Sequence, residues 1–281
     1  MAMSYQSILV HLDTGTHAQS RLELALQLAQ RFHAKLTGVL STYTPDKHEL
    51  FIMGGTASYY IEHEQQRQER CADLKRVFHA ALARAKVDGQ WIAITGYAND
   101  VIPPYARLAD LIVAGQIDLK DPDSFIAEQF VENLVMAAGR PVLVLPSSGS
   151  FTECGKHVLI AWDGSREATR AIHDALPFLS HAAKVTVLTV NAEQDAPDSV
   201  RMPGADIALT LARHDVKVEV REVTIERNTP VGDVLLSQTS ALGCDMIVMG
   251  AYAHTRLREL VMGGATRTIL RSMTVPVLFS H

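Results

Sequence analysis

Two glycine breaks late in the chain enclose a segment with the chemistry of an anion-binding loop. Gly250 ends a short apolar run, and Gly263 and Gly264 come later, directly before the predicted helix Ala265–Met273. A glycine pair at a helix start exposes backbone N–H groups at the positive end of the helix dipole, where phosphate groups bind. The hydroxyl of Thr266 adds one more donor. A plain helix cap, with glycines for tight packing, is the alternative that these residues leave open.

A carboxylate stands at the end of another apolar run. Asp163 follows Val158–Trp162 and precedes Gly164 and Ser165. In that place a carboxylate can accept hydrogen bonds from ribose hydroxyls, or face a metal ion such as Mg²⁺ that is bound to phosphate. The alternative is that Asp163 or Ser165 caps the helix that is predicted from Glu167.

The elements that would position these residues occur twice along the chain. The segment Ser7–Asp13 is echoed by His157–Asp163, Asp110–Gly115 by Asp245–Gly250, and Arg140–Val144 by Val275–Phe279. The spacing from Gly115 to Pro141 equals the spacing from Gly250 to Pro276. Three matched anchors in the same order indicate a tandem duplication.

Each half alternates apolar, β-rich runs with amphipathic helical patterns, joined by the small, flexible linker Ser147–Ser150. The predicted strands are Ile8–Leu12, Leu36–Leu40, Trp91–Thr95, Leu111–Ala114, Val142–Leu145, Val158–Trp162, Val185–Val190, Val216–Val223, Asp245–Met249 and Val275–Phe279. The predicted helices are Gln19–Phe32, Ile61–Lys86, Val101–Leu108, Glu167–Leu179, Gly204–Arg213, Val231–Leu242 and Ala265–Met273, with a loop over Thr44–Tyr60. This alternation predicts two α/β domains, over residues 1–150 and 151–281, each with a parallel sheet covered on both faces. Ligands bind such sheets at the carboxyl ends of the strands.

Composition limits the class of protein. The chain has 281 residues, is 47% hydrophobic and 20% charged, and carries a net charge of −5, which argues against a nucleic-acid partner or an anionic membrane surface. No apolar run approaches the ~18 residues of a membrane span, and the N-terminus lacks the pattern of a signal peptide. The three cysteines are far apart without a CxxC pair, which fits a reducing cytoplasm.

The C-terminal stretch resembles the universal stress protein family. The residues that carry the resemblance read M-G-x-x-x-H-x-R-x-R-E-L-V-x-G-G-x-T-R, followed by V-P-V-L near the end of the chain. The family's nucleotide-binding pattern is G-x2-G-x9-G-S/T. Gly250 and Gly263 match its first and third glycines, whereas Ala253 replaces the second glycine and Gly264 replaces the Ser or Thr.

The resemblance implies two tandem, doubly wound, five-stranded domains of the adenine nucleotide alpha hydrolase-like kind, related by a pseudo-twofold axis. It also implies binding of ATP or a related adenine nucleotide, with Mg²⁺ as a further option, a role in the stress response, and dimerisation. The site residues carried over are Ala161, Trp162, Asp163, Val190, Met249, Gly250, Ala253, His254, Gly263, Gly264, Ala265 and Thr266. Of these, Ala161 and Trp162 would line the site with backbone, and the backbone of Val190 would face adenine.

The same resemblance implies how the halves pair. Members with one copy pair through the last strand, so the two halves here are expected to form that pseudo-dimer within one chain. The edges of Val142–Leu145 and Val275–Phe279 are the expected contact. A homodimer of whole chains is a further option.

The first half is predicted to lack a working nucleotide site. Matching the halves through Gly115 and Gly250 places Glu128, Gln129 and Val131 opposite Gly263, Gly264 and Thr266. A carboxylate at the phosphate position repels phosphate. We therefore expect one site per chain, in the C-terminal half.

Two functions from different classes fit these residues. The first is a nucleotide-binding regulatory protein that acts on an unidentified protein partner, and the second is a nucleotide-free scaffold of the same fold. Slow ATP hydrolysis, supported by Asp163 and Mg²⁺, is a third. The sequence has no P-loop, no G-x-S-x-G elbow and no H-E-x-x-H motif, so no catalytic residue is assigned. His254 and the cations Arg256, Arg258 and Arg267 are candidate phosphate contacts at the rim, or solvated surface residues.

Overall fold

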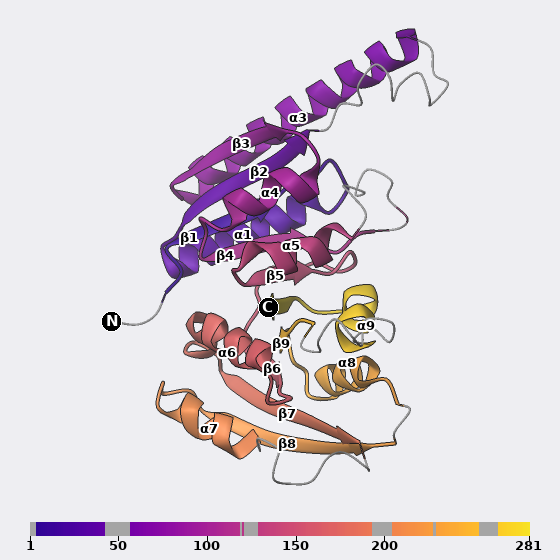
Figure 1. The fold of residues 1–281 in the computed structure, drawn as a ribbon. Coiled ribbons are helices and arrows are strands. Elements are labelled where there is room, and N and C mark those ends of the chain that lie inside the picture. Colours follow the sequence, from indigo (N-terminus) through magenta and orange to yellow (C-terminus); the bar gives the residue numbers. More distant parts are fainter. Residues whose placement is uncertain are drawn as a thin grey trace.

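The strands of both halves join in one sheet (Figure 1). The computed structural model describes residues 4–42, 57–118, 120, 129–192, 204–226, 229–252 and 264–281. Their ten strands follow the order β3-β2-β1-β4-β5-β10-β9-β6-β7-β8. The strands are β1 (Ser7–His11), β2 (Lys35–Thr42), β3 (Gly89–Thr95), β4 (Leu111–Gly115), β5 (Val142–Leu145), β6 (His157–Ala161), β7 (Lys184–Ala192), β8 (Val218–Ile225), β9 (Met246–Gly250) and β10 (Val277–Ser280).

The strand order reads the same from either end, because each half repeats one topology. Within each half all neighbouring strands are parallel. The two halves meet where β5 pairs with β10 in the antiparallel sense, with Val144 opposite Val277 and Val142 opposite Phe279. The predicted α/β class and the predicted contact between these two edges are both confirmed.

Helices cover both faces of the sheet. The helices are α1 (Ala18–Phe32), α3 (Ala57–Ala85), α4 (Ala98–Ala106), α5 (Phe130–Ala138), α6 (Arg166–Leu179), α7 (Gly204–Ala212), α8 (Val231–Ala241) and α9 (Gly264–Ser272). Helices α1, α3, α6 and α7 pack into one core, and α4, α5, α8 and α9 pack into the other. Because successive strand residues point to opposite faces, Ile8 and Val10 enter the first core and Leu9 enters the second.

Some element boundaries differ from the sequence prediction. Helix α3 begins at Ala57, so the predicted loop Thr44–Tyr60 is wrong over its last residues, and its residues 44–56 lie outside the described part. Helix α5 was not among the predicted helices. Helix α4 forms although Pro103 and Pro104 lie inside it. Its buried residues Ala98, Ile102 and Ala106 are spaced by four, which gives the helix one continuous apolar face on the sheet.

Aromatic rings and hydrogen bonds also cross the boundary between the halves. The Phe32 ring lies 5.0 Å from the Tyr5 ring and 5.2 Å from the Phe178 ring of the second half. The Tyr5 hydroxyl donates to the backbone oxygen of Asp174, on α6 of the second half, at 2.6 Å. The halves are therefore packed together by buried rings as well as by the strand pair.

Candidate functional site

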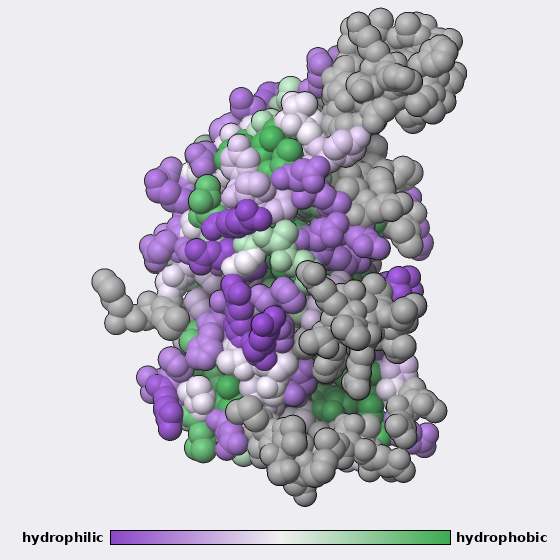
Figure 2. Space-filling model, in the orientation of Figure 1, coloured by the Kyte–Doolittle hydropathy of each residue, from purple (hydrophilic) through white to green (hydrophobic). Residues whose placement is uncertain are grey.

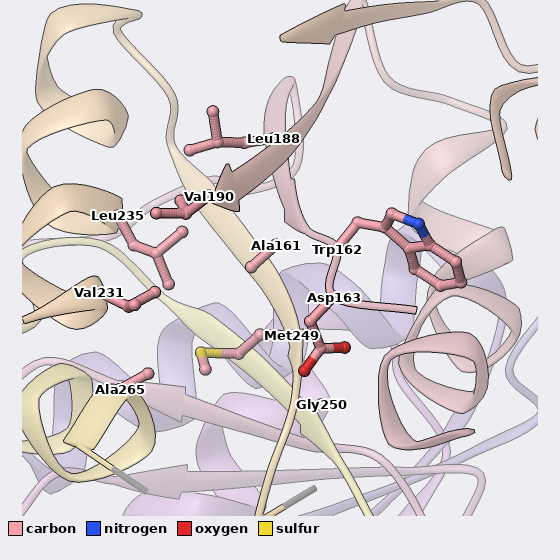
Figure 3. A pocket seen from close by; sticks show the side chains of 10 residues that line it. All are labelled: Ala161, Trp162, Asp163, Leu188, Val190, Val231, Leu235, Met249, Gly250 and Ala265. Carbon is pink, nitrogen blue, oxygen red and sulfur yellow. The ribbon is translucent and has the colours of Figure 1, made fainter. Parts of the chain in front are cut away.

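A cavity opens at the carboxyl ends of β6, β7 and β9 in the second half. Its empty volume is about 430 Å³, open solvent included. It is lined by Ala161, Trp162, Asp163, Leu188, Val190, Val231, Leu235, Met249, Gly250 and Ala265, which Figure 3 shows in close view. Its place agrees with the rule that ligands of parallel sheets bind at strand carboxyl ends.

One side of the cavity is apolar. Leu188 and Val190 stand two apart on β7, so they point to the same side of the strand. Val231 and Leu235 stand four apart on α8 and face them (Figure 3). Met249 completes this wall from β9. In the orientation of Figure 1, Figure 2 shows hydrophobic surface between α8 and β8. Such a wall suits a flat, weakly polar ring.

A carboxylate borders the cavity beside the apolar wall. Asp163 is exposed, and its Oδ1 accepts a hydrogen bond from the Ser165 backbone N–H at 3.0 Å. Ser165 is the N-cap of α6, because its Oγ accepts from the Ala168 N–H at 3.1 Å. Of the two capping residues considered from the sequence, Ser165 therefore supplies the cap. Asp163 orders the turn before the helix and remains at the cavity.

Trp162 contributes its backbone rather than its ring. The indole is buried in the core, and Figure 3 shows it directed away from Val190 and Leu235. The Trp162 backbone N–H donates to the Leu188 oxygen at 2.9 Å, which continues the pairing of β6 with β7 past the strand end. The indole thereby anchors the chain segment that carries Asp163.

Gly250 lies where β9 meets the first turn of α6. A Cβ at this position would lie 2.5 Å from the Ala168 backbone nitrogen and 2.6 Å from the Glu167 carbonyl carbon. Only glycine allows this approach of strand and helix. Tyr252 follows in a left-handed conformation, with φ of 57°. Burial raises the pKa of Tyr252 to about 12, Glu132 adds to the effect, and Arg267 opposes it.

The structure brings together most of the predicted site residues. Those that line the cavity are Ala161, Trp162, Asp163, Val190, Met249, Gly250 and Ala265. Gly264 is the exposed first residue of α9, and Thr266 is buried on α9 without lining the cavity. Ala253, His254 and Gly263 lie outside the described residues, as do Arg256 and Arg258.

Sequence reasoning missed three of the lining residues, namely Leu188, Val231 and Leu235. A signal for each was present. Leu188 shares a strand side with Val190, and the spacing of Val231 and Leu235 places both on one side of a helix that begins near the strand ends.

The described ranges contain no group of three or more His, Cys, Asp or Glu side chains that could hold a metal ion. None of their helices combines the length and the apolar character needed to cross a bilayer.

The sequence matches a known family over most of its length. The profile of the universal stress protein family matches residues 4–146 and again residues 155–281. The chain belongs to the universal stress protein family. Universal stress protein Slr1230 of Synechocystis sp. is 28% identical over 154 residues, which are 53% of this chain and 49% of that protein. The chain thus spans about half the length of this curated relative.

Solved universal stress proteins share the fold. A universal stress protein of Archaeoglobus fulgidus DSM 4304 aligns with 98% of this chain and 95% of its own, at 15% identity and a TM-score of 0.73. A protein of Pseudomonas aeruginosa UCBPP-PA14 assigned to the same family aligns with 98% of this chain and 93% of its own, at 16% identity and a TM-score of 0.59. At such identities the likeness concerns the fold alone.

The first half of this universal stress protein has different side chains at the corresponding strand ends. Asp13 and Arg21 form a buried ion pair, with side-chain exposures of 7% and 5%. The other Asp13 oxygen accepts from the Gly15 N–H at 2.9 Å. A Cβ on Gly115 would meet the Arg21 guanidinium, so this side chain lies against the end of β4. The carboxylate that corresponds to Asp163 is therefore enclosed by protein.

Beside this pair, two rings meet. His11 ends β1 and its ring centroid lies 4.6 Å from that of Phe130, the first residue of α5. Each residue is 2% exposed. Burial, reinforced by the Arg21 guanidinium and opposed by Asp13, lowers the pKa of His11 to about 3. The imidazole is therefore neutral at pH 7.

Proposed function

We propose that this universal stress protein binds ATP or a related adenine nucleotide in its second half and that occupancy regulates its interaction with a protein partner in the stress response. The observation that carries the proposal is the cavity itself. An apolar wall, an exposed Asp163 and the glycine end of β9 meet at the strand ends where nucleotides bind in doubly wound sheets.

Each part of the cavity suits one part of a nucleotide. The base would lie between Val190 and Leu235, against the backbone of the β7 end. The Asp163 carboxylate would accept hydrogen bonds from the ribose hydroxyls. The phosphates would extend past Gly250 toward the start of α9, where N–H groups without partners inside the helix and the helix dipole favour negative charge.

The remaining parts of the proposal rest on the family and the sequence. The site is proposed to include Ala253, His254 and Gly263 from the segment between β9 and α9, together with Gly264 and Thr266 of α9. Mg²⁺ would accompany the phosphates. The protein is proposed to act in the cytoplasm, with domains over residues 1–150 and 151–281.

A titration with ATP, followed by thermal or chemical unfolding, tests the proposal. A ligand at 100 times its Kd adds about 2.7 kcal/mol to the free energy of unfolding. Asp163→Asn keeps an oxygen that can accept from the Ser165 N–H but removes the charge, and it should reduce this gain. Asp206→Asn, at an exposed position on α7, is the matched control and should behave as the wild type. No gain at millimolar ATP would contradict nucleotide binding.

A nucleotide-free scaffold is the second candidate, and one observation favours it. The first half keeps the family fold although its strand-end carboxylate is enclosed by Arg21 and the backbone of Gly15. The fold of this half thus forms without an open site. In this case ATP would leave unfolding unchanged, while the protein would still bind its partner.

A further inference from the structure

We infer that the rings of His11 and Phe130 fill a second ligand site in the first half. This site lies at the strand ends that correspond to those around the cavity beside Asp163. The inference rests on the proposed function only for the class of ligand. A space of this kind would take a flat, neutral nitrogen heterocycle such as adenine. The chain would therefore bind one ligand, although its fold provides two places.

The hydrogen bonds establish which positions correspond. The Leu12 N–H donates to the Val39 oxygen at 2.9 Å, just as the Trp162 N–H donates to the Leu188 oxygen at 2.9 Å. The residue before each donor ends the first strand of its half. His11 in the first half therefore stands where Ala161 lines the cavity in the second.

The other ring is placed by the last helix of each half. Phe130 follows Gly115 at the same spacing as Ala265 follows Gly250. Both residues belong to the first turn of the helix, since α5 begins at Phe130 and α9 begins one residue before Ala265. Figure 3 shows Ala161 and Ala265 at the cavity as side chains of one carbon each. Replacing both with rings in contact fills the same space.

The two rings do not form an ordinary apolar core. The His11 Nε2 and the Arg21 Nε are buried and have no hydrogen-bond partner among the described residues. A buried polar atom without a partner is costly, and an apolar side chain of similar volume avoids that cost. The neutral imidazole therefore fills this place with a ring nitrogen that the described residues leave unpaired, close to the charged pair of Arg21 and Asp13. Asp13, which would face a ribose, is neutralised by Arg21 instead.

Exchanging the side chains between the halves tests the inference. The double variant Ala161→His with Ala265→Phe transfers the two rings to the second half, and it should fold and lose adenosine binding. The double variant His11→Ala with Phe130→Ala should open the first half and bind a second adenosine beside Asp13. Adenosine is the probe because it lacks the phosphates that a carboxylate at Glu128 would repel. Calorimetry gives the stoichiometry, and crystal structures with adenosine give the places.

A matched control is Phe32→Ala. It removes a buried first-half ring on the opposite core, where Phe32 contacts Tyr5 and Phe178. This variant should lose stability and still bind one adenosine. A second adenosine in this control would mean that loosening the first half, and not vacating the strand ends, creates the site, and the inference would be wrong.

The outcomes separate this inference from the proposed function. Wild-type protein that binds adenosine beside Asp13 overturns the inference, and so does a transferred ring pair that leaves adenosine affinity unchanged. If wild-type protein binds no adenosine, the proposed function fails, and the crystal structure of His11→Ala with Phe130→Ala still decides. An empty cavity beside Asp13 supports the inference, and a collapsed one overturns it. Should that variant fail to fold, the transferred pair decides, read in its crystal structure as a closed or open second-half cavity.

Discussion

The two halves have the same strand order and the same carboxylate at the first strand end, but they use that place differently. In the second half Asp163 is exposed at a cavity between Ala161 and Ala265. In the first half the corresponding carboxylate is paired with Arg21, and rings stand at both alanine positions. A few side chains at the strand ends therefore decide whether this fold holds an open site or a closed one.

The packing of the first helix on the fourth strand of each half differs for the same reason. The two atoms nearest to a Cβ on Gly250 would be backbone atoms of α6, whereas the three atoms nearest to a Cβ on Gly115 would belong to the side chain of Arg21. Arg21 corresponds to Ala171, which is small and buried. Beside Gly115, the Arg21 side chain thus occupies the space that the backbone of α6 occupies beside Gly250 in the second half.

The largest expected difference between the halves appears in acid. The pKa of His11 falls from an ordinary 6.5 to about 3 in the folded state, because of burial and Arg21, with Asp13 opposing. The unfolded chain therefore binds the proton first. The part of the free energy of unfolding that depends on His11 is fully present above pH 6.5 and is lost as the pH falls toward 3. At 1.36 kcal/mol per pKa unit, this loss is on the order of 5 kcal/mol.

The variant His11→Phe isolates this effect, because it keeps a ring but cannot titrate. Denaturant unfolding from pH 7 to pH 3 should show a smaller loss of stability for His11→Phe than for the wild type. The difference should be confined to that range. Parallel curves for the two proteins would show that His11 titrates normally and that the first-half site is not closed as described.

Breaking the buried ion pair should have the next largest effect. Arg21→Leu leaves the Asp13 carboxylate buried without its partner, which costs about 3–5 kcal/mol of unfolding free energy. Adding Asp13→Asn should restore part of this loss. Arg76→Ala breaks an exposed pair with Asp73 and should cost only about 0–1 kcal/mol. Urea unfolding measures all of these variants, and equal losses for Arg21 and Arg76 would contradict the closed first half.

Gly250 and Gly115, the last residues of β9 and β4, give a smaller and more specific contrast. Gly250→Ala must displace the backbone of α6 beside Asp163, so it should cost about 1–3 kcal/mol and weaken ATP binding. Gly115→Ala displaces the Arg21 side chain instead and should leave ATP binding unchanged. Calorimetry with ATP compares the two variants. Equal ATP affinity for both would show that the contact of β9 with α6 does not shape the cavity.

The smallest contrast concerns the helix that follows each carboxylate. Ser165→Ala removes the cap bond to the Ala168 N–H and should cost about 1 kcal/mol. His17, the N-cap of α1, makes no capping bond through its side chain, so His17→Ala should change stability by less than about 0.5 kcal/mol. Chemical unfolding resolves the difference. A larger loss for His17→Ala would mean that the capping assignment of the two halves is reversed.

Much of the fold follows from local patterns. Strand β9 and helix α6 could be predicted because apolar residues recur with the period of a strand or a helix, and a repeated pattern supports each assignment twice. Helix boundaries were less accurate where residues around Ala57 lacked a start signal. The prolines of α4 lowered the expectation of a helix that its spacing of buried residues nevertheless forms.

The duplication, the α/β class, and the positions of Asp163 and Gly250 at strand ends can be predicted from the residues alone, because these features depend on periodicity and order along the chain. Only the tertiary structure showed that Val231 and Leu235 face Val190, and that His11 lies against Phe130. Those contacts join residues from separate elements, so they depend on how helices pack across the sheet. The open site and the closed one therefore share one sequence pattern. They differ in which side chains the packing of helices on the sheet places in contact.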